Sequence, residues 1–177
     1  KATSNICTAQ ALLAIINSFY GVYHGPEGLR AIARRTQAFT CALIRGLARL
    51  GHHTMSSGPV FDTVRIRLGK GRAHAARQVA DAARERGINL REYSDGTLGV
   101  TLDETADRSL IADLLAAFNF GHFTGFDVDQ LLAEAQDAGT LELDTFERTS
   151  VFMTHDVFNS HHSETELLRY IFKLMSR

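Results

Sequence analysis

A long run of regularly spaced apolar residues near the start of the chain most restricts how the chain can fold. Apolar side chains recur there at steps of three and four residues, which is the spacing of one face of an α-helix. The run consists of Ile6, Ala9, Leu12, Leu13, Ile16, Phe19, Tyr20 and Tyr23. We therefore predict a helix that begins close to residue 6 and continues to about Tyr23.

Three polar residues stand at the start of this predicted helix. Ser4 or Asn5 can cap it, because a short side-chain oxygen accepts a hydrogen bond from an unpaired backbone N–H one turn further on. Together with Thr8 they surround a helix N-terminus, whose partial positive charge can hold a phosphate or a carboxylate. Capping and anion binding both stay open, although every helix needs a cap and few helices bind an anion.

A second helix follows the first after a short break. Gly25 can end the first helix, and Pro26 at a first helical position is a start signal for the next one. Apolar residues at helical spacing then continue until Gly51. The chain is therefore expected to open with a helical hairpin.

The middle of the chain predicts a small α/β layer. Alternating residues indicate strands, and Asp95-Gly96 between two alternating runs is typical of a β-hairpin. The order strand, helix, hairpin, helix indicates a largely antiparallel sheet with covering helices, an α/β (α+β) fold. The expected elements are a strand over 60–68, a helix over 73–86, strands over 88–93 and 98–102, and a helix capped by Thr105 or Asp107.

Periodicity weakens after Asn119. A short helix is expected over 126–138 and an extended crossing segment over 139–159. A capping box, in which Ser163 accepts from an N–H three residues on and Glu166 reaches back, then starts a last helix. We divide the chain into a helical hairpin (1–53), a small α/β domain (54–138), and an extended connector with a helix (139–177).

Composition excludes several classes of protein. The net charge is −1 and no basic run is present, which argues against a nucleic-acid-binding surface. Asn17, His24 and Arg34 interrupt the apolar runs, so no run reaches the length of a membrane span. Cys7 and Cys41 are expected to be reduced core residues rather than a disulfide framework. The chain shows no signal or transit pattern, and Lys1 looks like a point where a longer chain was cut.

No set of residues forms a complete catalytic or metal site by itself. The pairs His52-His53 and His161-His162 are adjacent, so their side chains diverge on a helix or a strand. We expect these histidines to be solvated or to cap helices rather than to form a metal site. His155-Asp156 could be a histidine with an orienting carboxylate, but the sequence marks no nucleophile nearby. The residues thus indicate an α/β domain that contributes to a site shared with another part.

Three ordered stretches of the sequence resemble one known family. They are KATSNICTAQALL continuing through YGVYHGPEGLRAIA, DGTLGVTLDET at Asp95–Thr105, and MTHDVFNSHHSETELLRY at Met153–Tyr170. All three resemble the P-protein family of the glycine cleavage system, the pyridoxal-phosphate-dependent glycine dehydrogenases (decarboxylating). Two departures stand out: Asp156 replaces the usual proline and His161 replaces the usual aromatic residue.

The resemblance implies where the chain lies in a larger enzyme. The family is built from two related halves, each similar to a fold-type I aminotransferase subunit. This chain resembles the small C-terminal domain of the first half and the connector to the second half. The family's cofactor lysine lies in the second half, and Lys1, Lys70 and Lys173 have no such context. The chain is thus expected to be a fragment that is inactive alone and contains no catalytic residue.

The resemblance also implies a reaction and partners. The intact enzyme would decarboxylate glycine with pyridoxal phosphate and pass the aminomethyl group to the lipoyl group of H-protein. Ser4, Asn5 and Thr8 would then contact the cofactor phosphate across an interface between the halves. The expected partners are the remainder of the P-protein and H-protein, in a homodimer or a heterotetramer. Bacterial relatives would be cytoplasmic and eukaryotic ones mitochondrial.

A second interpretation keeps the fold but not the chemistry. The chain would then be a non-catalytic α/β interaction or scaffolding module. The absence of a cofactor lysine suits both interpretations, so the sequence does not separate them.

Overall fold

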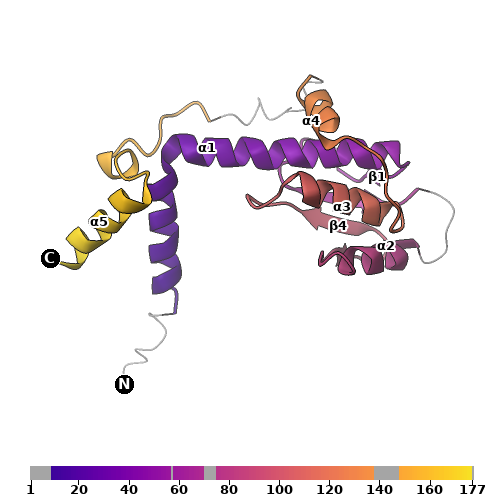
Figure 1. Cartoon of the computed structure of the whole chain (residues 1–177), viewed down its shortest axis with the longest axis horizontal. Coiled ribbons are helices and arrows are strands. Elements are labelled where there is room, and N and C mark those ends of the chain that lie inside the picture. The colour runs from indigo at the N-terminus through magenta and orange to yellow at the C-terminus, as the bar shows by residue number, and fades with distance from the viewer. Residues whose placement is uncertain (1–8, 57, 70–74, 138–147, 177) are drawn as a thin grey trace. The chain divides into compact units, whose positions relative to one another are not determined.

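The computed structural model describes residues 9–56, 58–69, 75–137 and 148–176 of the 177-residue chain (Figure 1). Ser4, Asn5, Cys7 and Thr8 lie outside the described residues. Backbone contacts divide the described chain into two units. The first unit joins residues 9–32 to residues 148–176, and the second consists of residues 33–137. The three-part division expected from the sequence stays a prediction.

Helix α1 begins at Ala11 rather than close to residue 6 as predicted, continues past the end expected at about Tyr23, and bends at one residue. It runs over Ala11–Arg49, and within it only Gly25, with φ 61° and ψ −177°, leaves helical geometry. Pro26 follows, and its ring prevents the helix from continuing undisturbed. The expected break is confirmed, but a hairpin needs a loop of about two to five residues. A single non-helical residue therefore gives a kinked helix in place of the helical hairpin (Figure 1).

The second unit contains a four-stranded antiparallel sheet in the order β1-β2-β4-β3. In β2 the exposed side chains alternate with the buried Val64 and Ile66, as the sequence predicts. Strand β1 was not expected, because two residues show no alternation. The strand bounds are His53–Thr54 for β1, Thr63–Arg67 for β2, Arg91–Glu92 for β3 and Leu98–Thr101 for β4.

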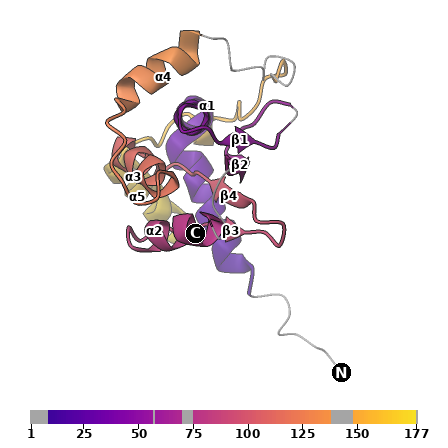
Figure 2. The same ribbon diagram turned by 90° about the vertical axis from the view of Figure 1, so that its right-hand side faces the viewer.

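Helices line one face of this sheet and enclose the core (Figure 2). The second unit contributes the end of α1, with α2 (Ala75–Arg84) and α3 (Arg108–Phe118) beside it. Asp107 caps α3 by accepting a hydrogen bond from the Leu110 N–H. The expected α/β fold with a largely antiparallel sheet and covering helices is confirmed. The core includes Leu43, Leu47, Ile66, Leu98, Leu115 and Phe118.

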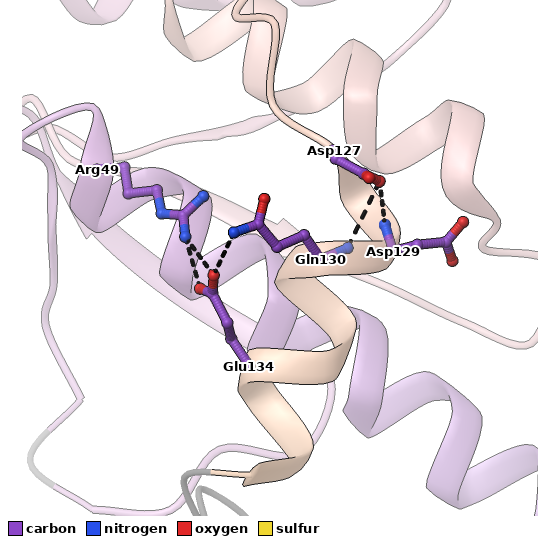
Figure 3. Close-up of polar contacts among 5 residues, drawn as sticks. All are labelled: Arg49, Asp127, Asp129, Gln130 and Glu134. Atoms are coloured by element: carbon purple, nitrogen blue, oxygen red, sulfur yellow. Dashed lines mark hydrogen bonds and ion pairs between the residues drawn. The ribbon is translucent and has the colours of Figure 1, made fainter.

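Polar side-chain contacts connect helix α4 (Val128–Asp137) to the end of α1 (Figure 3). Arg49 Nη2 lies 2.6 Å from both carboxylate oxygens of Glu134. Gln130 donates to the same carboxylate over 3.0 Å, one turn earlier on α4. Asp127 caps the helix by accepting from the backbone N–H of Asp129 at 2.9 Å. Arg49 and Glu134 lie 85 residues apart in the sequence, so the fold brings them together.

The adjacent histidines after α1 have different environments. His52 is buried, and its Nδ1 accepts from the Gly69 N–H over 3.1 Å. Its Nε2 lies 3.0 Å from the Phe118 carbonyl oxygen, which can only accept, so Nε2 carries the ring hydrogen. His53 is exposed on β1. The two residues therefore have different environments, as their adjacency predicts. The expectation of a solvated or capping residue is wrong for His52, which is buried and connects Gly69 to the end of α3.

The hairpin predicted at Asp95-Gly96 is confirmed. The Asp95 carboxylate accepts from the Thr97 hydroxyl at 2.7 Å and the Thr97 N–H at 3.1 Å. Arg65 on the neighbouring strand β2 donates to it over 2.8 Å. These hydrogen bonds, those of Thr97 foremost, lower the pKa of Asp95 from 3.8 to about 2. The charged form of this exposed carboxylate therefore favours the folded turn.

This shift predicts a pH dependence of folding stability. Because the folded pKa is about 2 and the ordinary value is 3.8, the contribution of Asp95 is present above pH 3.8. It is lost as the pH falls toward 2, where the folded carboxyl also takes up a proton. We expect Asp95→Asn to flatten this part of the stability curve in urea unfolding. Thr97→Val, which removes the principal donor, should flatten it too, and an unaltered acid limb in both variants would contradict the prediction.

Candidate functional site

The break in α1 lies in the wall of a cavity in the first unit. The cavity measures about 360 Å³. Both sequence segments that carry the family resemblance at the two ends of the chain contribute to it. Its lining consists of Tyr23, His24, Gly25, Pro26, Glu27, Asn159 and His162.

A hydrogen bond across the break joins the two segments. His162 Nδ1 lies 2.8 Å from the Tyr23 carbonyl oxygen, 139 residues away in the sequence. Because a carbonyl oxygen only accepts, Nδ1 carries the hydrogen, and Nε2 is the acceptor of the neutral ring. The departure of Gly25 from helical geometry ends the helical hydrogen-bonding ladder here, so this carbonyl needs another donor. His162 supplies that donor.

Gly25 is required at the break for two separate reasons. Its φ of 61° lies in the left-handed region that other residues rarely adopt. A Cβ atom at this position would also lie 2.6 Å from His162 Cε1 and 2.6 Å from the Phe158 carbonyl oxygen. Residues 148–163, which we call the C-terminal segment, thus contact the backbone of the kink directly.

The C-terminal segment is shaped by side chains that bond to their own backbone. It contains a single 3-10 turn, Asp156–Phe158, capped by His155, whose Nδ1 accepts from the Val157 N–H at 3.1 Å. Asn159 donates to the carbonyls of Met153 and His155 at 3.0 and 3.1 Å. His155 thus serves as a cap, and its imidazole is not oriented by the adjacent Asp156. Residues 148–159 of the expected extended segment therefore contain this turn, and residues 139–147 lie outside the described residues.

The last helix, α5 (Glu164–Met175), begins at the predicted capping box. Ser163 Oγ accepts from the Glu166 N–H over 3.3 Å, as expected. The Glu166 side chain reaches back as predicted, and its carboxylate accepts from the Ser163 hydroxyl at 3.0 Å. The cap therefore fixes where the helix starts, immediately after His162.

The paired histidines His161 and His162 point to different partners. His161 stacks on Tyr170 of α5, with ring centroids 4.5 Å apart and planes at 14°. His162 turns to the kink, where His24 packs against Tyr20 with centroids 4.3 Å apart. The divergence predicted from their adjacency is confirmed. Within the described ranges, no three or more His, Cys, Asp or Glu side chains are grouped so that they could hold a metal ion.

The cavity offers hydrogen bonds but no covalent chemistry. Its polar side chains are imidazole, amide, phenol and carboxylate groups, and the Glu27 carboxylate is paired with Arg30. The lining contains no lysine, serine, threonine or cysteine. The described part of the chain has one lysine, Lys173, on α5 rather than in the lining. The residues present therefore do not fit covalent attachment of pyridoxal phosphate in this cavity.

The remaining candidate residues lie outside the cavity or outside the described residues. Ser4, Asn5 and Thr8, the proposed phosphate contacts, lie outside the described residues. Cys41 is buried in α1 as expected, and burial raises the pKa of its thiol. The lining role of His24 was missed, because its place beside Gly25 was interpreted only as a helix break. In the described ranges no helix combines the length and apolar character that crossing a membrane requires.

Comparison with known proteins identifies close relatives. A family described as glycine cleavage system P-protein matches residues 1–118. Proteins named glycine dehydrogenase (decarboxylating) from Bdellovibrio bacteriovorus and Paraburkholderia phytofirmans are each 46% identical over 180 residues. The protein of the same name from Nostoc punctiforme is 43% identical over 179 residues. Each comparison covers 100% of this chain and 18% of the relative.

The geometry at the kink predicts opposite outcomes for two glycines of the same helix. Gly25→Ala should destabilise the first unit by about 1–3 kcal/mol from backbone strain, before the clash with His162 is added. Gly21→Ala should be neutral or stabilising, because its Cβ would lie 3.5 Å from Met153 Cε, an ordinary contact. Hydrogen exchange of α5 amides in each variant would measure this. Equal exchange in the two variants would mean that the kink does not hold the segment.

Proposed function

This chain belongs to the glycine cleavage system P-protein family, and we propose that it works as one segment of a glycine dehydrogenase (decarboxylating). The observation that carries this proposal is identity of 43–46% along its whole length with proteins of that name. The chain spans about 18% of the length of those relatives. The activity is therefore proposed for the longer enzyme, in which this segment supplies structure and contacts.

In this proposal the longer enzyme decarboxylates glycine and passes the aminomethyl group to the lipoyl group of H-protein. Pyridoxal phosphate, when bound, supplies the electron sink that such a decarboxylation needs. The cavity at the break in α1 has no lysine in its lining, which supports a covalent attachment in another part of the longer enzyme. We propose that this segment contributes no catalytic residue and is inactive alone.

The segment's own task is to fix the start of α1. The hydrogen bond from His162 to Tyr23 and the close contact at Gly25 hold the first part of α1 against the C-terminal segment. Ser4, Asn5 and Thr8 precede this helix in the sequence. The hydroxyl groups of serine and threonine and the side-chain amide of asparagine can each donate a hydrogen bond to a phosphate. We propose that they contact the phosphate of a cofactor bound across an interface.

The partners proposed are the remainder of the P-protein and lipoylated H-protein, in a homodimer or heterotetramer. The location proposed is the cytoplasm in a bacterium or the mitochondrion in a eukaryote. A second candidate function is a non-catalytic interaction or scaffolding module. The absence of lysine, serine, threonine and cysteine from the cavity lining favours this alternative as a description of the segment taken alone.

A chimera tests the proposed function. The matching 180 residues of the Bdellovibrio bacteriovorus relative would be replaced by this chain. We expect the chimera to release CO₂ from glycine in the presence of lipoylated H-protein, and the isolated chain to release none. A chimera that melts like the parent and binds pyridoxal phosphate but releases no CO₂ would contradict the enzyme proposal and favour the scaffolding module.

The phosphate contact makes a separate prediction in the same chimera. Thr8→Ala should weaken pyridoxal phosphate binding roughly 10- to 100-fold if the hydroxyl donates to the charged phosphate. Ser109→Ala, at an exposed position on α3, is the matched control and should leave the affinity unchanged. Cofactor absorbance during titration measures both. Unchanged affinity in Thr8→Ala would contradict the proposed phosphate contact.

A further inference from the structure

Two helices of the first unit carry large apolar side chains that the described residues leave exposed. They lie on the first part of α1 and on α5, and they are between 46% and 75% exposed. We call this set the two-helix apolar surface. It consists of Leu12, Leu13, Ile15, Ile16, Leu168, Phe172, Leu174 and Met175.

The first part of α1 lacks the polar face of a solvated helix. Residues 2–26 contain no aspartate, glutamate, lysine or arginine. A helix at a protein surface normally has charged residues on its outer side, and one that is apolar on most sides is normally buried. The composition of this helix is therefore that of a covered element, although its side chains are exposed.

Helix α5 has charged residues, but its apolar side chains are exposed as well. It is amphipathic, yet none of its residues is buried. Leu167, Tyr170 and Ile171 are half-buried, and the edge of Tyr170 meets Phe19 of α1 with ring centroids 6.3 Å apart. Leu168, Phe172 and the other exposed members remain outside this contact. The apolar face of α5 is thus wider than the contact that α1 offers.

A groove between the two helices gives the surface a defined shape. Its volume is about 530 Å³, enough for several apolar side chains. Almost all of its lining is apolar. The lining includes Ala14, Ile15, Phe19, Ile171, Leu174 and Met175. Such a groove fits protruding apolar side chains rather than a charged ligand.

We propose that another part of the same polypeptide covers the two-helix apolar surface in the full-length enzyme. The inference rests on family membership, because each relative is far longer than the 18% that matches this chain. The relatives therefore have other segments on the same polypeptide as the counterparts of α1 and α5. Covalent attachment gives such a segment a high effective concentration at the surface.

The chemistry of the surface favours this occupant over a lipid bilayer. A helix that lies in a membrane interface normally has lysine and arginine on its polar face. The first part of α1 has none between residues 2 and 26. A second copy of the chain would also bury apolar side chains, and it is one of the outcomes that the experiment separates.

The test compares two exposed phenylalanines in the chimera defined above. One variant is Phe172→Ser, because Phe172 lies on the two-helix apolar surface. The control is Phe123→Ser, because the side chain of Phe123 is 84% exposed in the second unit. We expect Phe172→Ser to lower the ratio of folded to unfolded chimera roughly 5- to 30-fold and Phe123→Ser to leave it nearly unchanged. Equal effects would overturn the proposal. Urea unfolding measures the stability of the chimera and does not depend on glycine turnover. A failure of this proposal can therefore be told apart from a failure of the proposed function.

A second measurement keeps the proposal testable if the chimera does not fold. Hydrogen exchange of the amides matching residues 11–20 and 167–175 would be followed in the unmodified Bdellovibrio bacteriovorus relative. We expect slower exchange there than in the isolated chain, and equally fast exchange would overturn the proposal. The isolated chain could instead form a dimer, which sedimentation would show. A dimer, together with unchanged stability of the Phe172→Ser chimera, would overturn the proposal in favour of a second copy.

Discussion

The contact between the C-terminal segment and the kink of α1 is the constraint on which the first unit depends. Gly25 interrupts the helix, which leaves the Tyr23 carbonyl without its helical partner, and His162 donates to that carbonyl over 2.8 Å. The absence of a side chain on Gly25 lets the Phe158 carbonyl and the His162 ring approach the backbone. One residue thus creates both the bend and the space that the distant segment occupies.

The second unit depends on a different kind of constraint, the burial of a conventional core. Alternation along β2 and helical spacing along α3 place Ile66 and Leu115 in the same apolar interior. Polar groups complete it where loops meet, as with buried His52 between Gly69 and Phe118. The two units thus differ in character: the second encloses its apolar residues, whereas the first leaves many of them exposed.

Local signals made most of the secondary structure predictable. Asp95-Gly96, Asp107 and Ser163 each act within a few residues, and all three form the turn or cap that their side-chain chemistry requires. Contacts between distant residues left no such signal. Nothing in the sequence spacing links Arg49 to Glu134, or His162 to Tyr23, because the fold alone brings these pairs together. The resemblance pointed to the right two stretches but not to the hydrogen bond between them.

The chemistry of the cavity lining explains why we describe the candidate site as part of a larger one. A cavity lined by imidazole, amide and carboxylate groups can position a neighbouring segment or a polar ligand, but it cannot form a covalent bond to a cofactor. An enzyme that places its reactive group elsewhere requires from this segment a fixed geometry and surfaces that fit the rest of the chain. The kink, held by the hydrogen bond between His162 and Tyr23, supplies the first requirement. The uncharged start of α1 beside α5 has the composition that the second requires.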